Sequence, residues 1–137
     1  MWIRGPLSCR LSAGIVQQIS ERIIALRHHV PCDFARKPCS LCDIDQWKAN
    51  EFRQFLLYTG PLVLKGLLSD LLYKHFLLFS VAMYCCLHTD LCYHYSDYCH
   101  QLLVMFVQQS ANLYGSDVLV YNVHALVHIA DDVRVFN

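Results

Sequence analysis

Apolar residues recur every three or four positions along residues 12–30, and this spacing predicts an amphipathic helix that packs one face on a core. The apolar face consists of Ile15, Ile19, Ile23 and Leu26. The opposite face carries Gln18, Glu21 and Arg22. Ser12 is placed to cap the first turn. Pro31 ends the helix, because the residue before a proline disfavours the helical conformation.

The segment 33–61 is the one around which we expect the rest of the chain to pack. It begins as a polar loop and then predicts a helix from Asp43 to Tyr58, with Ser40 and Asp43 as its capping box. One face of this helix should be buried. That face consists of Trp47, Glu51 and Phe55, widened by Phe52 and Leu56. Gly60–Pro61 is expected to break the helix, and Pro61 then opens a short third helix at its first position.

Two longer helices follow. Ser69 and Asp70 begin a fourth helix that continues to about Leu87 and is dominated by apolar side chains. Residues 88–95 are rich in histidine, cysteine and tyrosine, and they predict a break. A fifth helix begins at Ser96 or Asp97, and Gly115 is placed to end it as a C-terminal cap.

The two ends of the chain are less regular. Residues 1–11 show no periodicity and predict an irregular segment. Residues 118–121 favour a strand, whereas Asn122 is suited to cap a helix, and we expect a helix from Asn122 to Val133. The pattern as a whole predicts a mainly α protein, with about five to six helices in a single helical domain over residues 1–137.

The composition indicates that a partner covers part of the surface. The 137 residues are 55% hydrophobic and only 16% charged, whereas about a quarter of the residues of a typical domain are charged. Exposed apolar surface is therefore expected, and such surface marks interaction sites. The net charge is zero, so nothing global steers the chain to DNA or an anionic membrane. The one local basic cluster, Arg36–Lys37, is interpreted as a solvated turn.

The apolar stretch 62–87 is interpreted as a buried core helix. Four polar residues interrupt it, namely Lys65, Asp70, Lys74 and His75. Its longest clean run, Phe76 to Leu87, has about twelve residues, and a membrane span needs roughly twenty. No membrane partner is therefore predicted.

Eight cysteines raise the question of disulfides or metal. They stand at positions 9, 32, 39, 42, 85, 86, 92 and 99. The opening residues carry no apolar leader or other targeting signal, so we expect an intracellular, reducing setting and free thiols. Cys39 and Cys42 have the spacing of a zinc pair, with Cys32, His28 and His29 upstream, but a second close pair on a tight turn is missing from the pattern.

Two further clusters contain metal-ligating side chains. The first lies within residues 85–100 and consists of Cys85, Cys86, His88, Cys92, His94, Cys99 and His100. It has no recognised spacing, and it stays open as a site for a soft metal. The second is His124 and His128, followed by Asp131 and Asp132. It resembles a metallohydrolase motif, but Ala125 stands where that motif needs its glutamate, which favours a structural role.

Nucleophilic and phosphate-binding chemistry have no sequence support. Neither a glycine-rich nucleophile turn nor a phosphate-cradling loop occurs among the five scattered glycines. No catalytic or cofactor-binding residue is therefore assigned.

Several motifs in a fixed order resemble transposase-derived proteins of animal genomes related to the CACTA (En/Spm) type. The first group comprises residues 5–7, 9–11, 33–38, 47–49, 51–61 and 63–65. The second group comprises residues 113–115, 121–124 and 128–133. The resemblance covers essentially the whole chain. Cys39 and Cys42 depart from it, since arginine and serine are expected there, and Cys85–Cys86 and Asn137 depart from it too.

The resemblance implies a relation to cut-and-paste DDE transposases, whose ribonuclease-H-like core uses acidic residues and two divalent metals. It implies that this chain is the helical segment inserted between the catalytic motifs, or a C-terminal segment, of such an enzyme. The chain would then be no enzyme by itself, with no cofactor of its own, and it would be nuclear. The motif residues expected to have a structural role are Trp47, Glu51, Phe52, Arg53, Tyr58, Gly60, Pro61, Tyr114, Gly115, Asn122, His124, His128 and Asp132.

Three hypotheses for the function follow. The chain is a fragment or degenerate copy of a CACTA-type transposase that packs or oligomerises within the parent protein, or a helical interaction module recruited from a transposon. The third hypothesis is a Cys/His metal-binding module in residues 85–100. The expected partner is the rest of a transposase, or another protein, bound through apolar surface; DNA contact is left open, and zero net charge favours packing over DNA contact.

Overall fold

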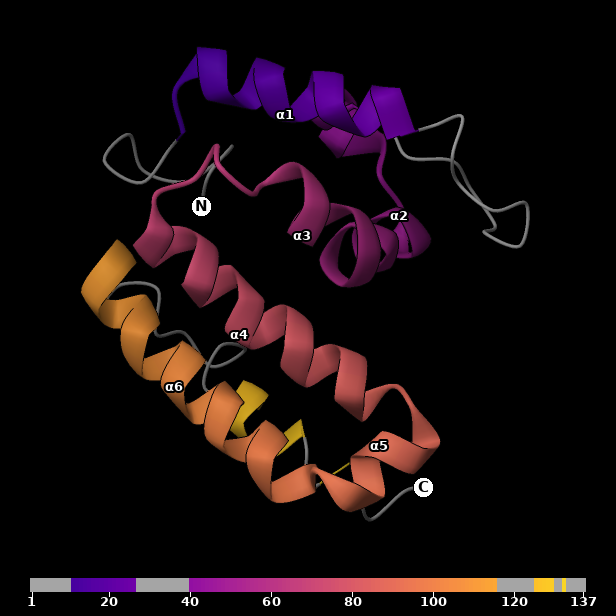
Figure 1. The fold of residues 1–137 in the computed structure, drawn as a ribbon, viewed down its shortest axis with the longest axis vertical. Coiled ribbons are helices and arrows are strands. Elements are labelled where there is room, and N and C mark those ends of the chain that lie inside the picture. The colour runs from indigo at the N-terminus through magenta and orange to yellow at the C-terminus, as the bar shows by residue number, and fades with distance from the viewer. Residues whose placement is uncertain (1–10, 27–39, 116–124, 130–131, 133–137) are drawn as a thin grey trace. The chain divides into compact units, whose positions relative to one another are not determined.

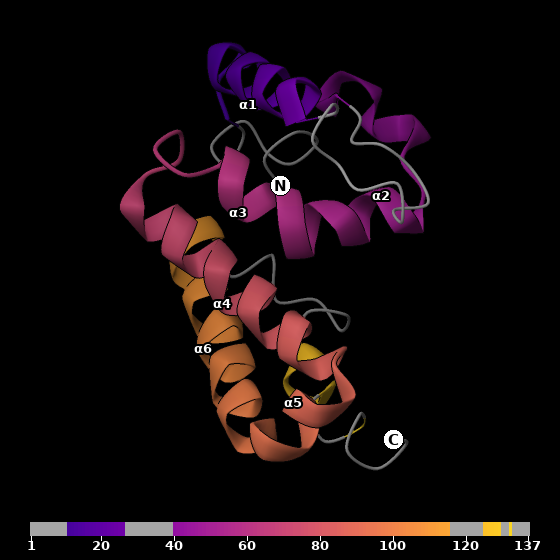
Figure 2. The ribbon, with the colours of Figure 1, turned by 45° about the vertical axis from the view of Figure 1, so that its right-hand side comes forward.

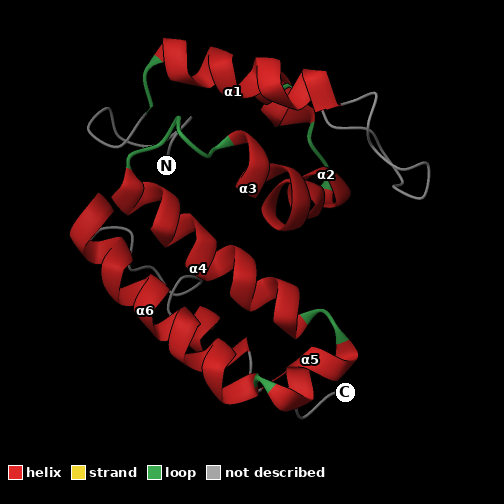
Figure 3. Ribbon diagram, viewed as in Figure 1, coloured by secondary structure: helices red, strands yellow, loops and turns green. Residues whose placement is uncertain are grey.

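A computed structural model describes residues 11–26, 40–115, 125–129 and 132. Every regular element within these ranges is helical (Figure 3). The prediction of a mainly α fold is therefore confirmed. Contacts divide the chain into two compact units, Met1–Ser69 and Asp70–Asn137. Each unit is described by itself, and a single domain over residues 1–137 stays a prediction.

The first unit contains one long helix and a set of shorter helical turns (Figure 1). They are α1 (Ala13–Leu26), the 3₁₀ helix η2 (Leu41–Gln46), α2 (Ala49–Gln54), the π-helical turn η3 (Phe55–Thr59) and α3 (Gly60–Val63). In the first helix, Ile19 and Ile23 are fully buried, and the backbone N–H of Ile15 donates to Ser12 Oγ at 3.3 Å. The predicted stripe and N-cap are confirmed, and residues 27–30 of that prediction lie outside the described residues.

The prediction that an α-helix begins at Asp43 is wrong. The chain forms the short 3₁₀ helix η2 instead, and the α-helix begins at Ala49. The indole Nε1–H of Trp47 donates to the carbonyl of Ser40 at 3.1 Å, which ties the chain into a turn before the helix. The Glu51 carboxylate then accepts from the backbone N–H of Lys48, one of the first donors of α2. The start of α2 is thus marked by Lys48 and Glu51.

Gly60–Pro61 does not break the helix as predicted. The backbone at Thr59 and Gly60 keeps helical angles, with φ/ψ of −80/−36° and −56/−52°. The Gly60 N–H donates to the carbonyl of Phe55, five residues back, which is a π-type bond. Because the ring of Pro61 would clash with a carbonyl four residues back in a regular α-helix, the wider turn accommodates it. Pro61 still lies in the first turn of α3, as predicted.

The second unit consists of two long helices joined by a short one. These are α4 (Asp70–Cys86), α5 (Thr89–His94) and α6 (Ser96–Tyr114), followed by the 3₁₀ helix η5 (Ala125–His128). Figure 2 shows α4 and α6 side by side, with α5 turning the chain between them. The two long helices therefore run in opposite directions.

The predicted break at residues 88–95 is wrong, because most of it forms α5. His88 lies in extended conformation just before the helix, and Asp90 in its first turn complements the positive end of the helix dipole. The thiol of Cys92 donates to the carbonyl of Thr89 at 3.1 Å. Gly115 ends α6 with a φ of 91°, as its predicted role as a C-terminal cap requires.

The core of the second unit lies where α4 and α6 meet. Its buried members are Ala82, Cys86, Cys99, Leu102 and Leu103. Leu126 and Ile129, from the closing segment, pack against it.

The helix predicted from Asn122 to Val133 is described only at 125–129 and 132, where η5 and two helical positions occur. The rest of that prediction lies outside the described residues. Among the described helices, none has the length and apolar character of a membrane span.

Candidate functional site

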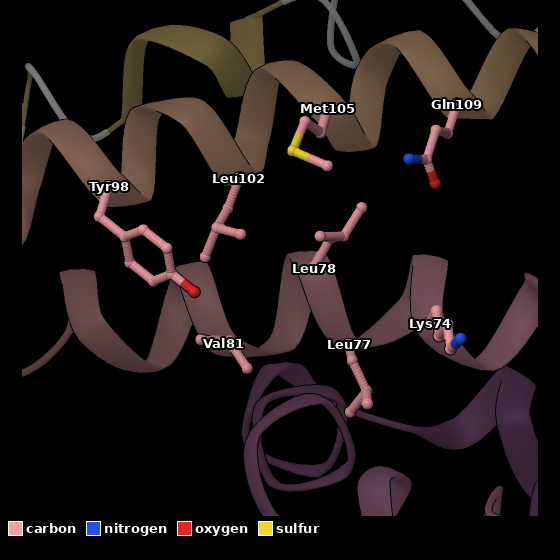
Figure 4. A pocket seen from close by; sticks show the side chains of 8 residues that line it. All are labelled: Lys74, Leu77, Leu78, Val81, Tyr98, Leu102, Met105 and Gln109. Atoms are coloured by element: carbon pink, nitrogen blue, oxygen red, sulfur yellow. The ribbon is translucent and has the colours of Figure 1, made fainter.

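A groove of about 390 Å³ runs along the surface between α4 and α6 (Figure 4). Its lining consists of Lys74, Leu77, Leu78, Val81, Tyr98, Leu102, Met105 and Gln109. All eight residues come from these two helices, so the groove belongs entirely to the second unit. Most of the lining is apolar, which is typical of sites that bind another molecule by hydrophobic contact.

The groove arises because α4 is apolar on more than one side. A helix with a single apolar stripe buries that stripe and leaves a polar back. In α4, Ala82 and Cys86 are directed into the core. Val81 remains 41% exposed on another side of the same helix. Met105 of α6 is 44% exposed, although Leu102, one turn earlier, is buried. Apolar side chains that one core cannot all accept therefore line the open groove.

Polar groups stand only at the two ends of the groove. Lys74 and Gln109 lie at one end, and the Tyr98 hydroxyl lies at the other (Figure 4). None of these three side chains forms a hydrogen bond or ion pair with another residue that the structure describes. Their donors are thus available to a ligand at positions separated by an apolar floor.

Exposed large apolar side chains extend beyond the groove, as the composition predicted. Leu62 is 66% exposed and Leu71 is 71% exposed. Around α5 the exposed residues are aromatic, with Tyr93 and Tyr95 each about half exposed. The expected apolar surface is therefore confirmed, and the α4–α6 groove forms one concave part of it.

The side chain of His75, in α4, is buried against α6. It is 3% exposed, and its ring stacks on Phe106 with centroids 4.2 Å apart. Its Nε2 lies 2.9 Å from the Phe106 carbonyl and 3.0 Å from Ser110 Oγ. Because a carbonyl only accepts, Nε2 carries the proton. Burial lowers the pKa of His75, and the bond to the Phe106 carbonyl opposes that shift in part. The ring is therefore a structural clamp in its neutral form.

The cysteines of the second unit are free thiols, as expected from the sequence. Cys85, Cys86, Cys92 and Cys99 form no disulfide. Burial raises the pKa of Cys99 to about 12, with neighbouring Cys85 and Cys86 adding to the shift, and burial likewise raises that of Cys86. Both thiols pack in the apolar core, where they behave as small hydrophobic groups.

The cluster predicted at 85–100 is not brought together as a metal site in the part of the chain that the structure describes. His94 is exposed, whereas His88 stacks on Tyr84 and lies with Nδ1 2.7 Å from the Tyr84 carbonyl. Among the other candidates, Cys32, His28, His29, His124 and Asp131, together with the side chains of Cys39 and Cys42, lie outside what the structure describes. His128 is exposed.

In the first unit, two motif side chains, Phe52 and Phe55, contact Trp47. Its ring contacts Phe52 edge to face at 5.3 Å and Phe55 at 5.8 Å. Trp47, Glu51 and Gly60 are buried, Tyr58 and Pro61 are half-buried, and Arg53 is exposed. Of the predicted buried face, Trp47 and Glu51 are buried, and Phe55 and Leu56 are half-buried. Phe52 is 48% exposed, and it is the one member of that face that departs from the prediction.

Next to Trp47 the first unit also has a small apolar cavity of about 130 Å³. It is lined by Ile19, Leu41, Ile44, Trp47, Phe52, Phe55 and Leu64. Its lining is apolar apart from the Trp47 indole N–H, which already donates to the Ser40 carbonyl, so a water molecule would find no partners there.

The motif residues near the C-terminus do not form one site. Tyr114 is half-buried and lies 5.7 Å from the His75 ring, and Gly115 ends α6. Asp132 is exposed, like His128. Asn122 and His124 lie outside the described residues. The groove itself shares no residue with the family motifs, and the only sequence signal for it was the apolar character of α4 on all sides.

Comparison of the chain with protein-family models, with curated proteins and with solved structures finds no match in any of the three.

Proposed function

We propose that this chain is a non-catalytic, helical interaction segment derived from a CACTA-type DDE transposase, and that it acts by packing against another part of that protein. The origin is supported by the ordered motifs, above all residues 33–38, 51–61 and 128–133. A parent enzyme of this type would supply the acidic residues and divalent metals from elsewhere. A transposase acts on DNA in the nucleus, so we place the segment there by its family resemblance.

The α4–α6 groove is the single observation that carries the interaction role. Val81 and Met105 expose apolar surface to water, and covering that surface with a partner protein lowers the free energy. A few apolar anchors near the centre of an interface carry most of its binding energy. DNA is disfavoured as the occupant, since Lys74 is the only charged residue of the lining.

A module recruited by a host protein would use the same groove, so this second candidate differs only in its partner. The metal-binding hypothesis is less well supported, because the thiols of Cys86 and Cys99 are held neutral inside the core, whereas metal ligation needs thiolates.

Two experiments test the proposal. The first determines the native transcript and asks whether the reading frame encodes acidic catalytic motifs on both sides of this segment. The second co-expresses the tagged chain with the catalytic core so encoded and measures copurification. We expect copurification to be lost in Met105→Glu and kept in Leu62→Glu, which adds the same charge at an exposed site outside the groove.

Each part of the proposal fails on its own result. A transcript without acidic motifs removes packing within a parent transposase as the role, and leaves the recruited interaction module. Equal copurification of wild type, Met105→Glu and Leu62→Glu removes the groove as the interaction surface. A strand-transfer assay with Mg²⁺ completes the test, since the chain alone should show no activity.

A further inference from the structure

We propose that the α4–α6 groove binds a short amphipathic helix that carries a carboxylate at the Lys74 end. This inference rests on the proposed interaction role and adds the chemistry of the partner. It follows from three features of the groove: its length, its lack of backbone hydrogen-bonding groups, and the placement of its polar ends.

The length of the groove matches two to three helical turns. Along α4 the lining extends from Lys74 to Val81, about 10.5 Å at the rise of an α-helix. Along α6 it extends from Tyr98 to Gln109, about 16.5 Å by the same rise. Apolar anchors at positions i, i+3, i+4 and i+7 of a partner helix cover that distance.

The chemistry of the walls favours a helix over an extended peptide. A strand needs partners for its backbone N–H and C=O groups. The walls are two helices whose backbones bond internally, and the only polar side chains that line the groove are Lys74, Gln109 and Tyr98. A helix satisfies its own backbone and presents only side chains, so it meets no unpaired group in the groove.

The open shape of the groove disfavours a small lipid-like ligand. Small-molecule sites bury most of the ligand surface. Here Val81, Tyr98 and Met105 are each between 41% and 51% exposed, so an acyl chain would stay open to water along one side. A second copy of the same groove is disfavoured too, because two concave surfaces do not fill each other in a two-fold contact.

The polar ends fix the sign of the partner. The Lys74 ammonium and the Gln109 amide lie together at one end of the groove, and neither has a partner among the described residues (Figure 4). A carboxylate accepts from both, and a charge-assisted hydrogen bond to an ammonium is stronger than a neutral one. An aspartate or glutamate at that end of the docked helix therefore completes the contact.

A fluorescein-labelled peptide of about 15 residues tests this assignment by fluorescence anisotropy with the full chain. It carries leucines at i, i+3, i+4 and i+7 and a glutamate one turn beyond the last leucine, and a matched peptide carries lysine in place of that glutamate. Wild type should bind the glutamate peptide about 3- to 10-fold more tightly, since one exposed charge pair is replaced by a like-charge pair. Lys74→Glu should reverse this preference, and Met105→Glu should weaken both peptides at least about tenfold.

Lys65→Glu and Leu62→Glu are the matched controls, because they make the same changes at exposed sites in the first unit. The assignment is overturned if wild type binds both peptides equally, if palmitate displaces the peptide, or if sedimentation shows that Met105→Glu only converts a dimer to a monomer. Any of these results leaves the broader interaction role standing. No peptide binding, combined with copurification that is unaffected by Met105→Glu, overturns both.

Discussion

Replacing His75 by phenylalanine should remove one hydrogen bond between α4 and α6 and keep the aromatic stack. The ring lies parallel to that of Phe106, at an interplanar angle of 9°, and phenylalanine can take the same position. The lost bond from Nε2 is worth about 0.5–1.5 kcal/mol net. The Phe106 carbonyl keeps a partner, because Ser110 Oγ–H donates to it at 2.7 Å. We therefore expect a loss of about 1 kcal/mol, or roughly 4 °C in Tm.

Truncating the same residue to alanine should cost more. His75→Ala loses the hydrogen bond, the stack on Phe106, worth about 0.5–1.5 kcal/mol, and the packing of a nearly buried ring. Truncation of a buried ring to alanine costs about 3–5 kcal/mol in total, and we expect a loss in that range. The difference between the two variants isolates the contribution of the ring from that of the hydrogen bond.

The His75 substitution also predicts a pH dependence with a definite sign. Because burial lowers the pKa of His75 in the fold below its ordinary value of 6.5, the unfolded chain binds this proton more readily. The stability that neutral His75 contributes is complete above pH 6.5, and it is lost as the pH falls from 6.5 through the lowered pKa. The free-energy gap between wild type and His75→Phe should therefore shrink from pH 7.5 to pH 5.

Urea denaturation followed by far-UV circular dichroism at the two pH values measures this gap. His94→Phe is the matched control, since it removes an exposed histidine ring from α5. A gap that stays the same at both pH values, or that widens in acid, would falsify the assignment of His75 as a buried, neutral clamp.

Three further predictions concern local contacts. Arg22→Ala should lower the free energy of unfolding by about 1–2 kcal/mol in thermal denaturation. The reason is that the Arg22 guanidinium donates to the backbone carbonyls of Val63 and Lys65, at 3.2 and 2.7 Å. Gln18→Ala, at an exposed site on the same helix, should change it little. Glu51→Ala should cost about 0.5–2 kcal/mol and Glu51→Gln much less, because the amide oxygen can still accept at the helix start; equal losses would contradict this role. Cys86 and Cys99 should resist iodoacetamide in the native chain and react fully in urea, as judged by peptide mass spectrometry; rapid native labelling would show that they are not core thiols.

Local sequence patterns predicted the structure correctly where it depends on a single turn or helix. The cap at Ser12 and the glycine end at Gly115 depend on backbone geometry within one turn, so both were predictable. The buried face with Ile19 and Ile23 followed from a simple apolar stripe on an otherwise polar helix.

The sequence was misleading where a contact across several residues overrides a local preference. Trp47 bonds to a carbonyl seven positions back, which delays the α-helix to Ala49. Pro61 would end an isolated helix, but a π turn at Phe55–Thr59 lets the chain continue. Neither contact has a periodic signal, because each depends on how the segment folds back on itself.

The position of the groove could not be predicted from the sequence for a different reason. In α4 apolar residues occur on all sides, so periodicity does not indicate which of them meets α6. Composition had predicted exposed apolar surface, but it could not place that surface at Val81 and Met105. The location depends on the packing of α4 on α6 alone.

The same packing explains how the second unit can fold and still retain an apolar surface for a partner. The α4–α6 core is closed by Cys86, Cys99 and Leu103, and His75 adds a polar clamp at the other end of the contact. Met105, which lies outside that core and is 44% exposed, contributes less to the stability of the unit than the buried core residues do. Binding and folding therefore depend largely on different side chains of the same two helices, although Leu78 and Leu102 contact both the core and the groove. Met105→Glu should consequently weaken binding at least about tenfold with only a small change in Tm. His75→Ala should instead lower Tm and weaken binding only through the fraction of folded chain.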